Sequence, residues 1–158
     1  MSRGRRFDSP SAAATAAWAA RLAPLLASGT VLLLDGELGA GKTTFVRGLA
    51  RGLGVKCAVR SPTFQLVREY HPLVHVDLYR LNAGDVAMLG LDDYLDGRHV
   101  IALEWGSRAG PDYDWGDASV MRLDFEMVGP RRRRITLSLD ERLPGPLLTL
   151  LESLTCAL

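Results

Sequence analysis

The stretch LLLDGELGAGKTTF, residues 32–45, places Gly36, Gly39 and Gly41 directly before Lys42. Lys56 is the chain's other lysine, and every other cationic side chain is an arginine, so a lysine at this position indicates a chemical need. Read as G-x-x-x-x-G-K-[ST], residues 36–43 match the phosphate-binding loop, or Walker A motif. This match decides the fold that we expect.

Each residue type in this loop suits a bound phosphate. Glycines let successive backbone N–H groups curve around the anion, and the helix that follows adds its partial positive charge. The Lys42 ammonium can reach the β- and γ-phosphates, and the Thr43 hydroxyl can ligate Mg²⁺. We therefore expect the loop's nucleotide-binding residues to be Gly36, Glu37, Leu38, Gly39, Ala40, Gly41, Lys42, Thr43 and Thr44.

The neighbouring sequence supports the motif over a chance glycine-rich turn. Residues 30–35, TVLLLD, form the short apolar run of a buried parallel strand. Residues 42–54 place Phe45, Val46, Leu49 and Leu53 at helical spacing, and Gly54 is a typical helix end. Strand, loop and helix thus follow in the order that a phosphate-binding loop requires.

Length and composition indicate an ordinary globular protein. The chain has 158 residues, 47% hydrophobic and 23% charged, so we expect one domain over 1–158. A net charge of +1 disfavours a globally basic nucleic-acid binder, and no apolar run approaches the roughly 20 residues of a membrane span. Cys57 and Cys156 form no C-x-x-C motif, which favours reduced thiols and a cytoplasmic location.

The N-terminal residues allow two interpretations. Residues 1–18 are rich in Arg, Ser and Ala, a composition shared by organelle transit peptides. We prefer a flexible basic tail over residues 1–9 that leads into a helix, because the Ala-rich segment runs straight on to the first strand.

Further along, helical and strand patterns alternate. We expect helices over about 10–27, 42–53, 84–95 and 146–157, and strands at 30–35, 64–70, 73–78 and 99–104. Residues 121–127 and 135–140 alternate apolar and polar side chains around Gly129-Pro130, which indicates an antiparallel hairpin at a sheet edge. The predicted fold is α/β, with a largely parallel P-loop NTPase-like sheet, antiparallel edge strands and helices on both faces.

Two carboxylates end apolar strands downstream of the loop. VIALE, residues 100–104, ends in Glu104, where a Walker B acid would lie, and VHVD, residues 74–77, ends in Asp77. A lone acid at a strand end is often only solvated or a helix cap. Two such acids after a phosphate-binding loop favour metal binding or water positioning.

Three other features leave their role open. Thr63 in RSPTF, residues 60–64, could sense the γ-phosphate, or the segment could be a plain Ser-Pro turn. Trp105 could stack on a ligand or partner, or merely cover an apolar edge. The run Arg131–Arg134 could be a solvated hairpin tip, or could contact nucleotide phosphate or RNA backbone.

With these residues considered together, the chain resembles the TsaE family, the P-loop ATPase subunit of bacterial tRNA threonylcarbamoyladenosine biosynthesis. The resemblance rests on GELGAGKTTFVRGLARGLG, VRSPTFQLV, HVDLYRL, LGLDDYL and LEW, in that order. Departures are Glu37, where the family often has Asp, Trp18, where a small residue is usual, and the length of the arginine run.

The resemblance implies a Mg²⁺-dependent ATPase, slow alone, that works with the TsaB and TsaD subunits and meets tRNA mainly through them. It implies that Thr43 and Glu104 hold the metal, that Asp77 and Glu104 act in catalysis, and that Thr63 belongs to a switch-like loop. It also implies that Thr15 lies near the adenine and that Arg131, after Gly129, lies near the nucleotide.

Three alternatives to this ATPase subunit share the same motif. A small-molecule kinase would need an acceptor pocket and usually a basic lid, and residues 78–99 show no obvious lid insertion. A regulatory GTPase would carry N-K-x-D, but the chain's single asparagine, Asn82, precedes Ala83. A nucleotide-binding scaffold would show no turnover even with partners.

Overall fold

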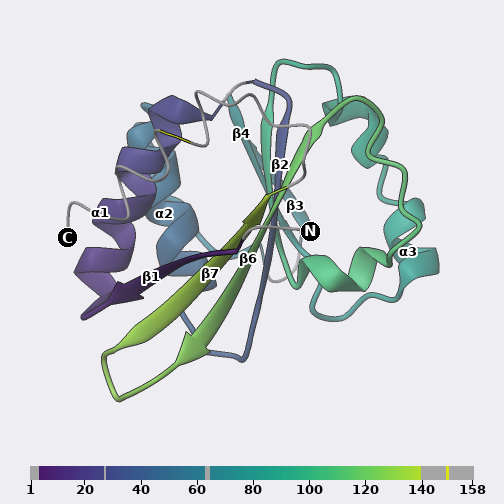
Figure 1. Cartoon of the computed structure of the whole chain (residues 1–158). Coiled ribbons are helices and arrows are strands. Elements are labelled where there is room, and N and C mark those ends of the chain that lie inside the picture. The colour runs from purple at the N-terminus through teal and green to yellow at the C-terminus, as the bar shows by residue number, and fades with distance from the viewer. Residues whose placement is uncertain (1–3, 27, 63–64, 140–148, 150–158) are drawn as a thin grey trace.

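The computed structural model describes residues 4–26, 28–62, 65–139 and 149, and a seven-stranded sheet forms its centre (Figure 1). From edge to edge the strands are β1 (Arg5–Ser9), β7 (Arg133–Leu139), β6 (Ser119–Met127), β2 (Thr30–Gly36), β5 (Val100–Glu104), β4 (Leu73–Asp77) and β3 (Val67–Tyr70).

The central strands are parallel and the outer ones antiparallel. β2 runs parallel to both β5 and β6, and β4 runs parallel to β5. β7 pairs antiparallel with β6 and β1, and β3 pairs antiparallel with β4. β5 is buried along its whole length, as a strand covered on both faces must be. The predicted P-loop NTPase-like α/β fold is therefore confirmed.

Helices cover both faces of this sheet (Figure 1). α1 (Ala12–Leu22) and α2 (Lys42–Gly52) pack together on one face. The short helix α3 (Ala83–Ala87) lies on the other, with 3-10 turns at Leu91–Tyr94 and Gly106–Ala109. The two helices of the first face touch closely, since a Cβ atom at Gly48 would lie 2.2 Å from the Ala16 carbonyl oxygen. Only glycine fits there.

An aromatic cluster joins the N-terminal segment to the core. The ring of Trp18, on α1, stacks on Phe7 of β1 at a centroid distance of 4.8 Å and contacts Phe45 of α2 at 5.7 Å. Trp18 is only 2% exposed. Trp18 is thus a core residue that covers the inner side of β1.

The predicted flexible tail is wrong for most of its length. Residues Arg5–Ser9 form β1, which pairs with β7 from Arg5↔Leu137 to Ser9↔Arg133. Phe7 and Ser9 are buried, so alternate side chains of this short segment face the core. The β6–β7 hairpin consequently lies inside the sheet, and β1, not the hairpin, forms the edge.

Several predicted elements are shorter than expected. The helix over 10–27 comprises α1 and a 3-10 turn at Ala23–Leu25 that contains Pro24. The helix over 84–95 is divided by Gly90, whose φ of 71° is left-handed, into α3 and the turn Leu91–Tyr94. The strand predicted from residue 64 begins at Val67. The last predicted helix, 146–157, lies almost wholly outside the described residues.

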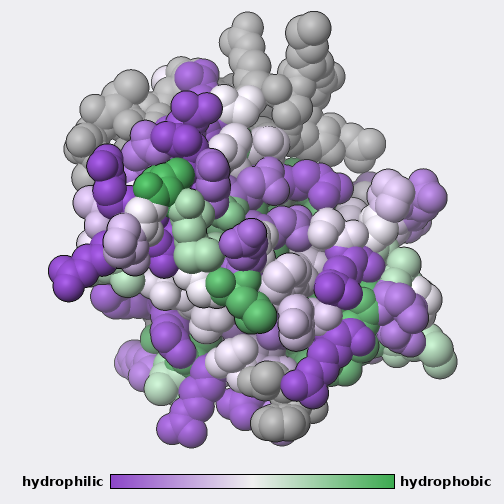
Figure 2. Space-filling view, turned by 90° about the horizontal axis from the view of Figure 1, so that it is seen from below, coloured by the Kyte–Doolittle hydropathy of each residue, from purple (hydrophilic) through white to green (hydrophobic). Residues whose placement is uncertain are grey.

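The surface seen from below the view of Figure 1 is mostly hydrophilic, and hydrophobic residues form small separate patches on it (Figure 2). Within the described ranges, no helix combines the length and apolar character needed to cross a membrane.

Candidate nucleotide site

The phosphate-binding loop connects the end of β2 to the first turn of α2, as its sequence predicts. At the start of the loop, Gly36 has a φ of 150°, and a Cβ atom there would lie 2.5 Å from the Phe125 carbonyl oxygen. Any other residue would push the loop away from β6. Gly41 then precedes Lys42, the first residue of α2, so the loop leads directly into the N-terminus of this helix.

Lys42 folds back against its own loop. Its Nζ atom donates hydrogen bonds to the carbonyl oxygens of Gly36 and Glu37, the latter at 3.0 Å, and lies 4.1 Å from the Trp105 ring centroid. Burial lowers the pKa of Lys42, while the charges of Glu104, Asp35 and Asp77 oppose that shift. A negatively charged ligand would therefore stabilise the charged ammonium where burial disfavours it.

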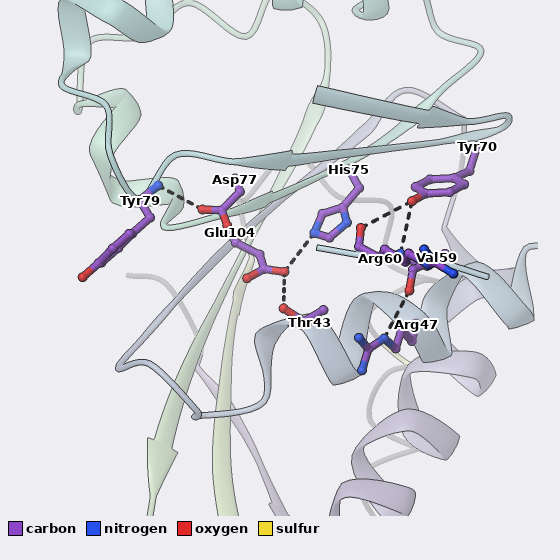
Figure 3. A network of polar contacts seen from close by, with 9 residues as sticks. All are labelled: Thr43, Arg47, Val59, Arg60, Tyr70, His75, Asp77, Tyr79 and Glu104. Atoms are coloured by element: carbon purple, nitrogen blue, oxygen red, sulfur yellow. Dashed lines mark hydrogen bonds and ion pairs between the residues drawn. The ribbon is translucent and has the colours of Figure 1, made fainter. Parts of the chain in front are cut away.

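Glu104 links β5 to the start of α2. Thr43 Oγ1 donates to Glu104 Oε1 at 2.7 Å, and His75 Nε2 lies 2.8 Å from the same oxygen (Figure 3). Burial alone would raise the pKa of Glu104, but the hydrogen bond and charge of His75, the Thr43 hydroxyl and Lys42 together lower it. The group is an ionised acceptor, so His75 Nε2 carries the proton in this contact.

Asp77 lies beside Glu104 because β4 and β5 are paired in register, Asp77↔Glu104. Its Oδ1 atom accepts a hydrogen bond from the Tyr79 backbone N–H at 2.9 Å (Figure 3). The turn after β4 thereby fixes one carboxylate oxygen, and Asp77 lines the cleft that also contains Glu104 and Lys42.

Two cavities adjoin the loop. One has a volume of about 330 Å³ and is lined by Leu38, Gly39, Gly41, Lys42, Thr43, Thr44, Ser61, Asp77, Tyr79, Arg80, Glu104 and Trp105. The other has a volume of about 290 Å³ and is lined by Ser11, Ala12, Thr15, Gly39, Gly41, Thr44, Pro130, Arg131 and Arg133. Gly39, Gly41 and Thr44 border both, so the cavities meet at the loop. Their positions suit the phosphates and the nucleoside of one ligand, respectively.

Thr15 and Arg131, which the resemblance implies near the nucleotide, both line the second cavity. Thr15 is 1% exposed, and its Oγ1 atom forms hydrogen bonds with the Ser9 hydroxyl at 2.7 Å and the Ser11 carbonyl at 3.3 Å. Its hydroxyl is therefore already paired within the protein, and Thr15 forms part of the cavity wall.

Arg133, and not Arg131, is the arginine that contacts the phosphate-binding loop. Its guanidinium donates to the carbonyl oxygens of Ala40 at 3.1 Å, Gly39 at 3.0 Å and Gly129 at 3.2 Å. Arg134 instead lies 3.2 Å from Asp8 on β1, and Arg131 is exposed. Alternation along β7 gives adjacent arginines different surroundings, which the sequence run by itself did not resolve.

One contributor to the site, His75, escaped the sequence analysis, and Arg133 was considered there only as a member of the run Arg131–Arg134. His75 is fully buried and precedes Asp77 by two residues, so both side chains leave the same face of β4. That period of two in VHVD is the signal that could have identified it. Thr63 lies outside the described residues, and Ser61, in the same segment, lines the cleft.

Thr43, Glu104 and Asp77 are the residues that could hold a metal ion. They offer a hydroxyl and two carboxylates at one edge of the sheet, and Thr43 and Glu104 already converge to 2.7 Å. Mg²⁺ prefers such hard oxygen ligands, usually one or two carboxylates completed by water and substrate phosphate. The donor set fits Mg²⁺.

Comparison with known proteins agrees with this geometry. The family model described as threonylcarbamoyl adenosine biosynthesis protein TsaE matches residues 9–135. The chain belongs to the TsaE family. The matched segment runs from the end of β1 into β7 and includes every described residue that borders the two cavities.

Individual TsaE relatives support the assignment. The chain is 43% identical to the tRNA threonylcarbamoyladenosine biosynthesis protein TsaE of Treponema pallidum, over 84% of this chain and 99% of that protein. It is 46% identical to the protein of the same name from Synechocystis sp., over 65% of this chain and 70% of that protein. Against three further bacterial TsaE proteins the match spans only about half to two thirds of their length.

Among solved structures, YdiB of Bacillus subtilis superimposes with a TM-score of 0.78 at 31% identity, covering 99% of this chain and 97% of that one. This chain and YdiB therefore have the same fold over nearly their whole lengths.

Proposed function

We propose that this TsaE protein is the Mg²⁺-dependent ATP-binding and ATP-hydrolysing subunit of tRNA N6-threonylcarbamoyladenosine modification, acting in the cytoplasm with the TsaB and TsaD subunits. The observation that carries the proposal is the hydrogen bond of 2.7 Å between Thr43 and Glu104. It brings the hydroxyl that follows the loop lysine next to an ionised carboxylate on the neighbouring strand, and these are the two kinds of side chain that hold Mg²⁺ in P-loop NTPases.

In this proposal, different residues bind the phosphates and the nucleoside. The loop N–H groups and the N-terminus of α2 cradle the phosphates, and Lys42 supplies the positive charge. The cavity lined by Thr15, Arg131 and Arg133 receives the nucleoside. An adenine base is favoured, because the chain has no N-K-x-D motif for guanine.

Hydrolysis would draw on the two carboxylates. Thr43 and Glu104 would hold Mg²⁺, which neutralises charge on the β- and γ-phosphates when bound. His75 keeps Glu104 oriented through its contact of 2.8 Å. Asp77, whose Oδ1 accepts a hydrogen bond from the Tyr79 N–H, would orient the attacking water, and Thr63 would complete the γ-phosphate end of the site.

The deciding experiment measures phosphate release from ATP by the purified chain, alone and then with TsaB, TsaD and tRNA. We expect slow Mg²⁺-dependent release that changes when the partners are added. Phosphoryl transfer to a small alcohol instead of water would favour a small-molecule kinase. ATP binding without turnover under all conditions would favour a scaffold.

A further inference from the structure

Three side chains with metal-binding atoms gather far from the nucleotide site. Glu69 on β3, His71 in the β3–β4 turn and His99 directly before β5 each offer one ligand atom, and these atoms lie within 4.8 Å of one another. They lie where β4 and β5 begin, whereas Asp77 and Glu104 lie where these strands end. His99 and Glu104 are five residue steps apart along the strand, or about 16 Å.

Hydrogen bonding prepares His99 as a ligand. Its Nδ1 atom lies 3.0 Å from Asp96 Oδ1 and its Nε2 atom lies 3.4 Å from Glu69 Oε1. When the Nδ1–H group donates a hydrogen bond to Asp96, a neutral ring presents the Nε2 lone pair to the Glu69 carboxylate. Two acceptors then face each other and need a cation between them. Carboxylate–histidine–metal arrangements orient their ligands in this way.

The position of His71 favours a metal ion over a proton as that cation. A proton shared between His99 and Glu69 needs no third partner, yet a ligand nitrogen of His71 also lies within 4.8 Å of the ligand atoms of both residues. Tyr94 packs edge-on against His99 at 5.5 Å, which helps to hold the buried ring in place. Glu69 and His71 are exposed and can adjust toward a shared ion.

The donor set indicates the kind of metal. Two imidazoles and one carboxylate are a familiar zinc ligand set with a fourth position left for water, and they suit Mg²⁺ or Ca²⁺ poorly. A tetrahedral site with bonds of about 2.0–2.1 Å separates its ligand atoms by roughly 3.4 Å. The pair His99–Glu69 already has that separation.

We propose that Glu69, His71 and His99 form a binding site for a divalent transition metal of the zinc class, with Asp96 orienting His99. The ion connects the β3–β4 hairpin at the sheet edge to the start of β5. A hydrogen bond from the Val100 N–H to the Pro72 carbonyl, at 2.9 Å, also joins these segments. The site is separate from the Mg²⁺ site proposed for the nucleotide.

The test titrates Zn²⁺ alone into the untagged, nucleotide-free full chain by calorimetry, with excess Mg²⁺ present. We expect one Zn²⁺ per chain and a higher unfolding temperature. His71→Ala and Glu69→Gln change exposed side chains and should each weaken Zn²⁺ binding at least about tenfold, as should Asp96→Asn. The first two should leave circular dichroism and ATP hydrolysis unchanged.

A thiol site is the main competing explanation, so Cys57→Ser is the matched control, because Cys57 is a free, exposed cysteine. This variant should keep full Zn²⁺ affinity, and Co²⁺ bound to the wild type should show no thiolate-to-metal charge-transfer absorption. The proposal is overturned if the wild type binds no stoichiometric Zn²⁺, if His71→Ala and Glu69→Gln bind it as tightly as wild type, or if Cys57→Ser abolishes binding.

Discussion

Thr43 Oγ1 lies 2.7 Å from Glu104 Oε1, although the two residues are 61 positions apart in the chain. The contact exists because β2, which leads into the loop, runs parallel to β5 with Leu34 opposite Glu104. The loop hydroxyl and the strand-end carboxylate therefore reach the same point at the carboxyl edge of the sheet. The predictions below start from this relationship.

Glu104→Gln should slow ATP hydrolysis about 10- to 100-fold while weakening ATP binding less, because the amide keeps its size but loses the charge that supports the metal. Asp77→Asn should act in the same direction. Single-turnover phosphate release and equilibrium ATP titration separate the two effects, with Glu126→Gln, a change to an exposed acid on β6, as control. Normal turnover in both variants would mean that other acids do this work.

The lowered pKa of Glu104 predicts how stability depends on pH. Burial opposes the shift, but His75, Thr43 and Lys42 hold the folded-state pKa below the ordinary value of 4.5. The stabilisation is therefore fully present above about pH 4.5 and is lost as the pH falls through the lower folded-state pKa. Denaturant unfolding of wild type and Glu104→Gln from pH 7 to pH 3 should show a difference in unfolding free energy that shrinks toward acid. A constant difference would contradict the assignment.

Lys42→Ala should weaken ATP binding about ten- to hundredfold, because a charge-assisted contact to phosphate contributes about 1.5–3 kcal/mol. Lys56→Ala is the matched control, since it removes the chain's other lysine at an exposed position after α2. Calorimetric titration with ATP measures both. Equal affinity in the two variants would refute the role of Lys42.

Arg133→Ala should lower both stability and ATP affinity, because three loop and hairpin carbonyls lose a donor. Each charge-assisted bond contributes about 1.5–3 kcal/mol at most, and partial exposure reduces that figure. Arg133→Lys should lose nearly as much stability and ATP affinity as Arg133→Ala, since an ammonium cannot donate to several carbonyls in the fork geometry of a guanidinium. Arg132→Ala, at an exposed neighbour, should have almost no effect. Thermal unfolding with and without ATP measures all three variants.

The isolated chain should bind tRNA only weakly at physiological salt. Within the arginine run, Arg133 is engaged with the loop and Arg134 with Asp8, which leaves Arg131 and Arg132 exposed. Two phosphate contacts on a chain of net charge +1 give affinity in the nonspecific range, about 10⁻⁴–10⁻⁶ M. Filter binding across a salt series, with and without the partner subunits, measures this. Tight binding by the chain alone that is lost when all four arginines become serine would identify the run as a tRNA site.

The sequence by itself determined the parts of this protein that are local in the chain. Strand, loop and helix at residues 30–53 are contiguous, and hydrophobic period, glycine positions and the loop motif all indicate the same structure. The acids at the ends of the 74–77 and 100–104 strands could also be identified, because the carboxyl edge of a parallel sheet is where ligands bind. The family followed from the combination of these motifs.

The tertiary structure alone decided which distant groups meet. Residues 5–9 have no strong strand pattern, and they form β1 only because β7 offers an edge to pair with and Trp18 covers Phe7. Which arginine binds the loop depends on the side of β7 from which each side chain leaves. The burial of His75 against Glu104, and the approach of His71 to His99, depend on how β4 and β5 are aligned. Strand order and register are set by packing over long separations, which local sequence does not encode.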